Sequence, residues 1–363
     1  TDERVNRFSW RSGEAKRLNG DPEHLTAEDI ETVLATQVVP DPPEDFPQFW
    51  TEVATELEAT PMDLELVPVE VESAPPDVST YIWTATSLGG RRIAGPVAWP
   101  ENTGGPRPQW VYGHGYGSRN GCGWNFAPAR KGFITLGLDA RGYGRSRLDG
   151  DPSVPGWVLH GIESPKDYIL RGAVADTIRA VQVARTLEGA DPTRTVLKGG
   201  SFSGGLAVLA APWISNLAYV AVSVPTFGAY SLRRTLVERG SGKEVNDYLD
   251  RVGPARAETI LQNLRYFDAV NAAPYVTAPI SVGLGVIDAV VPGETVAAIY
   301  HALGSRDKEL LHYPCSHSTH PLTGAWRAWE EHILERAARH VGLEVTSRLT
   351  DFASPRSHIG TSS

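Results

Sequence analysis

Residues 195–211 read TVLKGGSFSGGLAVLAA, a pattern that indicates a short strand, a tight turn and a helix. A serine hydroxyl is a weak nucleophile and has to be exposed beside a base before it can attack. A sharp turn at the end of a strand exposes it, but the crowded backbone then needs small neighbours, which Gly199 and Gly200 provide. Ser203 stands where the pattern G-x-S-x-G has its last glycine. Ser201 is therefore the predicted nucleophile.

The same turn leaves two alternatives open. Ser203 is itself followed by two glycines and is a second candidate for the nucleophile. A glycine-rich turn after a strand also occurs in phosphate-binding loops, although the Gly-Lys-Ser/Thr that usually completes them is missing here. We expect Gly199, Gly200 and Gly204 to support the turn.

Beyond residue 107, short apolar segments alternate with helical stretches. The expected strands are 109–112, 133–138, 195–198, 219–223, 279–284 and 309–313. The clearest helix is 167–187, in which apolar residues recur at helical spacing. This alternation predicts an α/β fold, with a mostly parallel central sheet covered by helices on both faces. Functional loops are then expected at the carboxyl ends of the strands.

The first part of the chain has a different pattern. Residues 65–99 alternate apolar and polar side chains around a Gly89-Gly90 turn and predict antiparallel strands. A helix is expected at 26–38, where Thr26 and Asp29 fit a capping box. A second amphipathic helix is expected around 46–57.

The chain of 363 residues is compatible with two domains or with one large domain that carries insertions. We expect an N-terminal arm at 1–40, one catalytic domain at 41–345 and a C-terminal tail at 346–363. Residues 225–275 have no strand pattern and predict a helical insertion in that domain.

Composition narrows the class of protein. The chain has 43 acidic and 34 basic residues, a net charge of −9, and no run of basic residues, which argues against nucleic acid or membrane partners. No segment approaches the roughly 20 apolar residues of a membrane span. The two cysteines, Cys122 and Cys315, are too few for a disulfide scaffold or a four-cysteine zinc site. The sequence starts at Thr1 without a charged-then-apolar leader pattern, so a cytoplasmic protein is expected; a secreted one stays open, since a removed leader leaves no trace.

Two late loops contain candidates for the partners of the serine. Asp288 follows the strand at 279–284, and His317 follows the strand at 309–313. A catalytic imidazole needs a carboxylate that fixes its tautomer, so the order Ser, Asp, His is a complete triad. As alternatives, Asp288 is a turn or helix-cap residue, or His320 replaces His317 as the base. Cys315 with the two histidines also resembles a zinc site, but three crowded ligands make this the weaker hypothesis.

A glycine-rich loop at 110–118, WVYGHGYGS, follows another predicted strand. The oxyanion of an ester's tetrahedral intermediate needs backbone N–H donors from two loops. We expect these donors to be the amides of Tyr116 and of Phe202, the residue after the nucleophile. His114 is a possible metal ligand or base, although a structural role at the strand end is favoured.

Three further residues are candidates with a structural alternative. Arg141, in the turn RGYGRS at 141–146, is expected to tie loops together behind the site. Trp124 and Tyr143 are candidates for the substrate pocket, and aromatic residues of this kind also occur as ordinary core.

This combination resembles the acetylxylan esterase/cephalosporin-C deacetylase family of α/β hydrolases over about residues 41–340. The residues that carry the resemblance occur in the family's order along the chain. They are Phe49-Trp50, Gly115-Tyr116, Trp124, Arg141-Gly-Tyr-Gly, Gly161-Ile162, Tyr168, Arg171, Asp191, Gly199-Gly200-Ser201, Val224-Pro225, Tyr266-Phe267-Asp268, Val270-Asn271, Ser281-Val-Gly-Leu, Asp288, Pro292, Tyr313-Pro314 and His317.

The resemblance implies that Ser201 is the nucleophile, His317 the base and Asp288 the carboxylate that orients it. The amides of Tyr116 and Phe202 would form the oxyanion hole. It also implies hydrolysis of acetyl and other short acyl esters of sugars, by homo-oligomers that are often hexameric rings with active sites facing an interior cavity.

The chain departs from the family pattern near the site. Phe202 and Ser203 stand where the family has Gln-Gly, and Tyr143 stands where it has Gln. Ser318 follows the histidine in place of Glu. We expect the rings of Phe202 and Tyr143 to make the rim of the pocket more apolar, with Pro225 as a further lining residue.

The sequence therefore predicts a serine carboxylesterase that acts through an acyl-enzyme on short-chain esters of a sugar or small natural product. It predicts no metal and no organic cofactor. The same triad also suits a thioesterase, lactonase, C–C hydrolase or acyltransferase, because one fold hosts many reactions. A non-catalytic binding protein with this fold is the remaining alternative.

Overall fold

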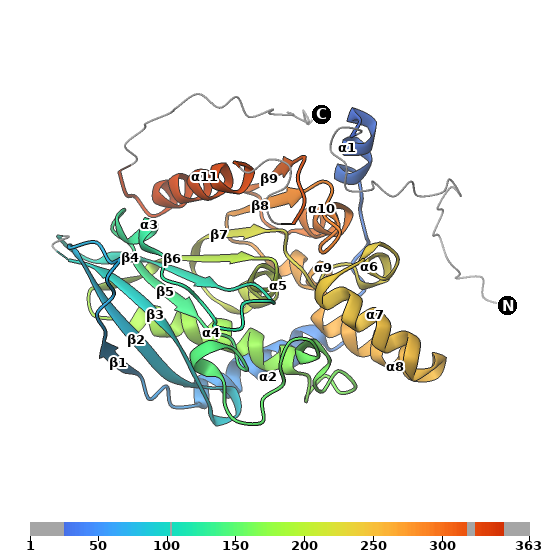
Figure 1. Ribbon diagram of the computed structural model, residues 1–363, viewed down its shortest axis with the longest axis horizontal. Helices are drawn as coiled ribbons and strands as arrows, with labels where there is room; N and C mark the ends of the chain where they lie inside the picture. The colour runs from blue at the N-terminus through green and yellow to red at the C-terminus, as the bar shows by residue number, and fades with distance from the viewer. Residues whose placement is uncertain (1–24, 102–103, 318–323, 345–363) are drawn as a thin grey trace.

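The computed structural model describes residues 25–101, 104–317 and 324–344 (Figure 1). In this part of the chain one sheet runs through the molecule in the strand order β1-β2-β3-β5-β4-β6-β7-β8-β9. The strands are β1 (Glu65–Pro68), β2 (Val78–Ser87), β3 (Arg91–Pro100), β4 (Arg107–Gly113), β5 (Ile134–Leu138), β6 (Ala190–Gly200), β7 (Leu217–Ser223), β8 (Ile280–Gly285) and β9 (Lys308–Tyr313).

The sheet changes character between β3 and β5. β1, β2 and β3 pair antiparallel, and β3 pairs antiparallel with β5. Every pair from β5 through β4, β6, β7 and β8 to β9 is parallel. The predicted antiparallel beginning and parallel centre are both confirmed, and the carboxyl ends of six strands meet at one edge.

Alternate residues of the central strands face opposite layers, as the pleat requires. On β7, Val220 and Val222 belong to the main core, whereas Tyr219 and Ala221 belong to a second core under the last helix. Both faces of the strand are therefore apolar, which is the pattern of a sheet buried on both sides.

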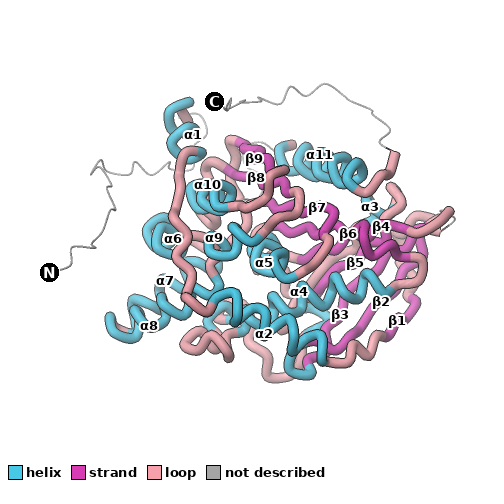
Figure 2. The backbone as a smooth tube through the Cα atoms, turned by 180° about the vertical axis from the view of Figure 1, so that it is seen from behind, coloured by secondary structure: helices cyan, strands magenta, loops and turns pink. Residues whose placement is uncertain are grey.

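Helices cover both faces (Figures 1 and 2). The main core lies between the sheet and α2 (Phe46–Ala59), α4 (Ile169–Thr186), α5 (Phe202–Ala210), α9 (Ala269–Ala272) and α10 (Gly293–Ala302). The short α3 (Phe126–Ala129) and the longer α11 (Ala325–His340) pack on other parts of the sheet. The α/β-hydrolase fold expected from the sequence is confirmed.

The predicted helical insertion is also observed. It contains α6 (Tyr230–Leu236), α7 (Gly240–Val252) and α8 (Pro254–Leu264). Figure 1 shows these three helices together on one side of the sheet. The backbone N–H of Glu238, between α6 and α7, donates to the carbonyl of Ala289 at 3.1 Å, so the insertion contacts the loop after β8.

The N-terminal arm is described from residue 25 onward. The predicted capping box is present at α1 (Ala27–Leu34), where Thr26 and Asp29 bond each other reciprocally. α1 contacts α10 with a buried Val33, and the ring of His301 bonds the carbonyl of Leu34 at 2.7 Å. The tail expected at 346–363 lies outside the described residues. Among the helices of the described residues, none has the length and apolar character needed to cross a membrane.

Candidate active site

Ser201 occupies the turn between β6 and α5 with φ 52° and ψ −112°. Residues other than glycine rarely adopt a backbone conformation with this positive φ, so the surrounding structure has to hold Ser201 in it. Three backbone hydrogen bonds do so. The Ser201 N–H donates to Ser223 at 2.8 Å, and its carbonyl accepts from Gly205 at 3.0 Å and Thr226 at 3.1 Å.

Two glycines allow the turn to close. A Cβ at Gly199 would lie 2.2 Å from the carbonyl oxygen of Ser203, and one at Gly205 would lie 2.3 Å from that of Thr226. Both distances are far below a van der Waals contact, so a larger residue at Gly199 would push β6 away from α5, and one at Gly205 would push α5 away from the loop after β7. The crowding expected from the sequence is therefore present.

The two candidate serines differ in their surroundings. The Oγ of Ser203 accepts a hydrogen bond from the Gly200 N–H and donates one to the Gly200 carbonyl, both at 3.0 Å. Ser203 is only 7% exposed, whereas Ser201 is half-buried. The Ser203 hydroxyl is thus occupied by the turn itself, which favours Ser201 for chemistry.

Asp288 and His317 form a hydrogen-bonded pair. Nδ1 of His317 lies 2.7 Å from Oδ2 of Asp288, and the other carboxylate oxygen accepts from the amides of Val290 at 2.8 Å and Val291 at 2.9 Å. The Asp288 side chain is 0% exposed and the His317 side chain 26%. When Nδ1 of His317 donates to this carboxylate, the neutral form of the imidazole keeps Nε2 as an acceptor.

The topology places these residues at one edge of the sheet. Ser201 follows β6, Asp288 follows β8 and His317 follows β9, and these strands run parallel with β7 between the first two. Within the described ranges no hydrogen bond joins Ser201 to His317. Catalytic hydrogen bonds are often long before substrate binds. His320, the alternative base, lies outside the described residues.

The two proposed oxyanion donors come from adjoining loops. Phe202 is the first residue of α5, where backbone N–H groups have no partner within the helix. Tyr116 lies three residues beyond β4. The centroids of the two rings lie 5.9 Å apart, so the loop after β4 packs against the start of α5.

The ring of Phe202 is the centre of a buried aromatic cluster. It lies 5.1 Å from Trp157, 5.6 Å from Tyr143 and 5.6 Å from His114. Phe202 and Tyr143 are 1% and 2% exposed. The expectation that these rings line the rim of the pocket is therefore not met, because both side chains are buried in the main core. Burial raises the pKa of Tyr143 well above its usual value.

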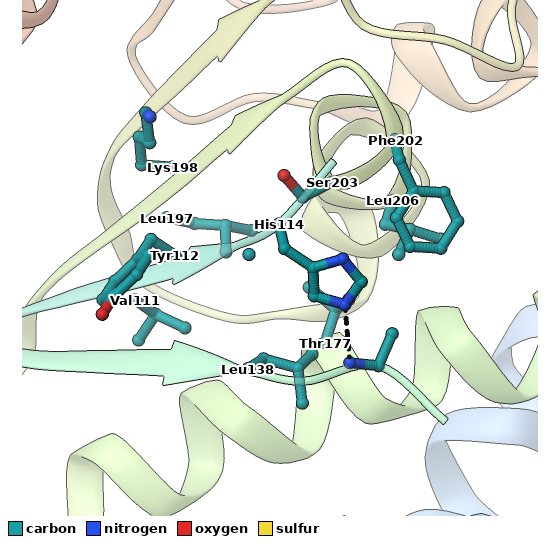
Figure 3. Close-up of a pocket in the computed structure, with 12 residues that line it drawn as sticks. Val111, Tyr112, His114, Leu138, Thr177, Leu197, Lys198, Phe202, Ser203 and Leu206 are labelled. Carbon is teal, nitrogen blue, oxygen red and sulfur yellow. Dashed lines mark hydrogen bonds between the residues drawn. The ribbon is translucent and has the colours of Figure 1, made fainter. Parts of the chain in front are cut away.

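A cavity of about 20 Å³ lies under the serine turn. Figure 3 shows Ser203 reaching it from the start of α5 and His114 from the loop after β4. Its volume suits about one water molecule. Its lining residues do not include Ser201, Asp288 or His317, and its volume is too small for an ester substrate.

His114 has the structural role that the sequence favoured. Its Nδ1 lies 2.9 Å from the Gly115 carbonyl, and its Nε2 accepts the Ala140 N–H at 3.1 Å. These partners fix a neutral imidazole that joins the ends of β4 and β5. Burial lowers its pKa below the ordinary 6.5.

Arg141 joins three elements through the carboxylate of Asp176. Its Nε and Nη2 donate to the two carboxylate oxygens of Asp176 on α4 at 2.8 and 2.7 Å. The same carboxylate accepts from the Ser87 hydroxyl at 2.6 Å. The loop after β5, helix α4 and the end of β2 are thereby joined.

The remaining pocket candidates have different positions. Trp124 stacks on Phe126 at 6.0 Å, in a cluster with Val78, Ala98 and Ala129 that contains no residue of the site. Pro225 is buried beside the start of α5 and stays a prediction for the acyl pocket.

The zinc hypothesis depended on Cys315, His317 and His320. In the described part of the chain no group of three or more His, Cys, Asp or Glu side chains is arranged to hold a metal ion. His317 is instead bonded to Asp288. Burial raises the pKa of the Cys315 thiol to about 12.

The sequence matches the family model described as acetyl xylan esterase over residues 25–331. The chain belongs to the acetyl xylan esterase family. The match begins ahead of the stretch on which the resemblance rested and includes α1. As a member of this family, the protein is a carboxylic ester hydrolase with the α/β-hydrolase fold.

Solved structures share this fold. Acetyl xylan esterase 1 from Thermoanaerobacterium sp. JW/SL YS485 is 24% identical with a TM-score of 0.74, and the alignment covers 84% of this chain and 98% of that one. The acetyl xylan esterase from Paenibacillus sp. R4 is also 24% identical, with a TM-score of 0.76 and coverage of 85% and 99%. A puromycin hydrolase is 19% identical with a TM-score of 0.57, and the alignment covers 76% of this chain and 42% of that one.

Two residues near the site were missed by sequence reasoning. Trp157 packs on the Phe202 ring and donates its indole N–H to the Arg141 carbonyl at 2.9 Å. Glu244 of α7 bonds the hydroxyl of Tyr116 at 2.9 Å. Neither lies in a strand-end motif, so only the folded arrangement identifies them.

Proposed function

We propose that this family member is a serine carboxylesterase that hydrolyses acetyl or other short-chain acyl esters through an acyl-enzyme. The observation that carries the proposal is Ser201, held in a strained turn at the same sheet edge as the Asp288–His317 pair. The family and the names of the two similar esterases favour an acetylated carbohydrate as substrate.

In the proposed first step, Nε2 of His317 takes the proton of the Ser201 hydroxyl while Oγ bonds to the ester carbonyl carbon. The amides of Tyr116 and Phe202 donate to the resulting oxyanion. The C–O bond to the alcohol then breaks, and the alcohol leaves with the proton from His317. Asp288 stabilises the imidazolium that exists between these events.

In the second step, a water molecule gives its proton to His317 and attacks the acyl carbon. The bond to Ser201 Oγ breaks, the serine regains its proton, and the carboxylic acid is released. No metal takes part in this sequence, so hydrolysis is expected to survive dialysis against EDTA.

The decisive test is hydrolysis of p-nitrophenyl acetate by matched variants. Ser201→Ala is expected to abolish turnover and labelling by a fluorophosphonate probe while the fold is kept. Ser203→Ala is expected to be less stable but active and labelled. If Ser203→Ala were inactive and Ser201→Ala active, the nucleophile would be Ser203 and the proposed assignment would be wrong. A wild-type protein that is not labelled would favour a non-catalytic role.

The substrate class needs a separate measurement. A panel of p-nitrophenyl esters of rising acyl length, run beside acetylated sugars, is expected to show highest kcat/KM for acetyl. A maximum at long acyl chains would contradict the acetylesterase assignment, as would a higher kcat/KM for an acetyl thioester that is measured beside the panel. We also propose, from the family resemblance, that the chain forms a homo-oligomer, with a hexamer as the expected result of light scattering.

A further inference from the structure

Glu244 lies on α7 of the helical insertion, far from the catalytic residues in sequence. Its Oε2 accepts the Tyr116 hydroxyl at 2.9 Å and the Gly156 backbone N–H at 2.7 Å. The Tyr116 hydroxyl in turn accepts the N–H of Val158 at 3.2 Å. One carboxylate oxygen therefore joins the insertion, the loop after β4 and the turn that contains Trp157.

These contacts fix Tyr116 from the far end of its side chain. Its ring is also held 5.9 Å from Phe202 and 6.3 Å from Trp157. An oxyanion donor works only when it lies about 2.7–3.1 Å from the oxyanion, so a small displacement of this loop weakens transition-state binding. The hydroxyl of Tyr116 is thus an anchor for its own backbone amide.

The insertion contacts the opposite side of the site as well. The Glu238 N–H donates to Ala289, which directly follows Asp288. A Cβ at Gly240 would lie 2.9 Å from Val290, whose amide bonds Asp288. The short stretch from 238 to 244 thereby bridges the loop of the catalytic acid and the loop of the oxyanion hole.

We propose that Glu244 is a positioning residue, whose carboxylate sets the oxyanion hole by anchoring Tyr116 to the helical insertion. The proposal rests on the proposed function, because it assigns Tyr116 the same role. If Glu244 has this role, the helical insertion contributes to the geometry of the oxyanion hole.

A glutamate side chain suits this position, because its Oε2 alone accepts from both donors. Hydrogen bonds to a charged acceptor are stronger than neutral ones. Glutamine retains one acceptor oxygen without the charge, and alanine leaves the phenol and the Gly156 amide without this partner.

The test compares Glu244→Ala and Glu244→Gln with Glu258→Ala, which removes an exposed glutamate of α8 in the same insertion. Active sites are counted by labelling one portion of each variant to completion with a fluorophosphonate. The kinetics with p-nitrophenyl acetate are measured on a second, unlabelled portion. We expect kcat per labelled site to fall about tenfold in Glu244→Ala, which corresponds to an activation barrier raised by about 1.4 kcal/mol. KM is expected to stay within about twofold, Glu244→Gln to be intermediate, and Glu258→Ala to match wild type.

A second variant tests the route of the effect. Tyr116→Phe removes the hydroxyl but keeps the backbone amide. If Glu244 acts through that hydroxyl, the double variant is expected to be about as slow as Glu244→Ala alone and not as slow as the product of both losses. Independent, multiplying effects would overturn the anchoring role.

A purely structural role gives a different result. A lower melting temperature of Glu244→Ala with unchanged kcat per labelled site would overturn the proposal while the proposed function stood. If Glu244→Ala does not fold, Glu244→Gln decides by the same two readouts. A wild-type protein that neither labels nor hydrolyses would refute the proposed function first, and the Glu244 proposal with it.

Discussion

Replacing Ser201 with glycine is expected to make the protein more stable and inactive. The residue has φ 52° and ψ −112°, a conformation that glycine adopts freely and that a side chain makes unfavourable. Such local strain costs about 1–3 kcal/mol. The nucleophile therefore lowers the stability of the fold at its own position.

The expected gain is smaller than the strain itself. Glycine adds conformational freedom to the unfolded chain, which offsets about 0.4–1 kcal/mol. The net gain in the free energy of unfolding is then between about 0 and 2.6 kcal/mol, and the midpoints of the two ranges give about 1.3 kcal/mol. Ser201→Ala is the matched control, because it also loses the hydroxyl but keeps the Cβ that causes the strain.

Urea denaturation followed by tryptophan fluorescence measures the difference. Midpoints of wild type, Ser201→Ala and Ser201→Gly are compared at equal slope, so that only stability differs. The expected order is Gly above Ala, with Ala close to wild type. A glycine variant no more stable than the alanine variant would show that the turn is not strained as described.

Three further predictions concern the groups around the serine. Asp288→Asn is expected to lower kcat about 10⁴-fold with little change in melting temperature, because the amide forces His317 into the wrong tautomer; steady-state kinetics would expose an error if turnover stayed normal. The pKa of His114 in the folded protein lies below its value near 6.5 in the unfolded chain, so the unfolded chain binds the extra proton. The free energy of unfolding is therefore expected to fall as the pH drops below about 6.5. A free energy of unfolding that stays constant between pH 7 and 5, or a pH dependence that is the same in His114→Gln, would contradict this. Arg141→Ala is expected to lower the free energy of unfolding by about 3–5 kcal/mol, because it leaves the buried carboxylate of Asp176 without its cation. Urea denaturation measures this loss, and a value below about 1 kcal/mol would refute the prediction.

The regular elements could be predicted because their signals are local. The capping box of Thr26 and Asp29 appears at α1, and the apolar segment at 279–284 appears as β8 with almost the same bounds. Period and capping depend on residues a few positions apart, so the sequence contains them directly.

The pairing of Asp288 with His317 could also be anticipated, for a topological reason. Loops after neighbouring parallel strands meet at one edge, so residues 29 positions apart come within 2.7 Å. The choice between Ser201 and Ser203 was a weaker prediction, because it depends on which hydroxyl the turn uses for its own hydrogen bonds.

The sequence could not predict whether an individual side chain faces the core or the pocket. Phe202 and Tyr143 follow strand ends, where lining residues are expected, but their rings point into the core against Trp157. Glu244 is one acidic residue among several on an amphipathic helix, and its importance comes from Tyr116, 128 positions earlier. Contacts of this kind depend on packing between distant segments, which local patterns do not contain.

The central claim is that Ser201 is acylated during turnover. Rapid quenching of the enzyme with an acetyl ester, followed by proteolysis and mass spectrometry, measures this directly. The account predicts a transient acetyl group on the peptide at Ser201, which accumulates when water attack is slowed and is missing in Ser201→Ala. Acetyl on Ser203, or hydrolysis at full rate with no acylated serine at any time, would contradict it.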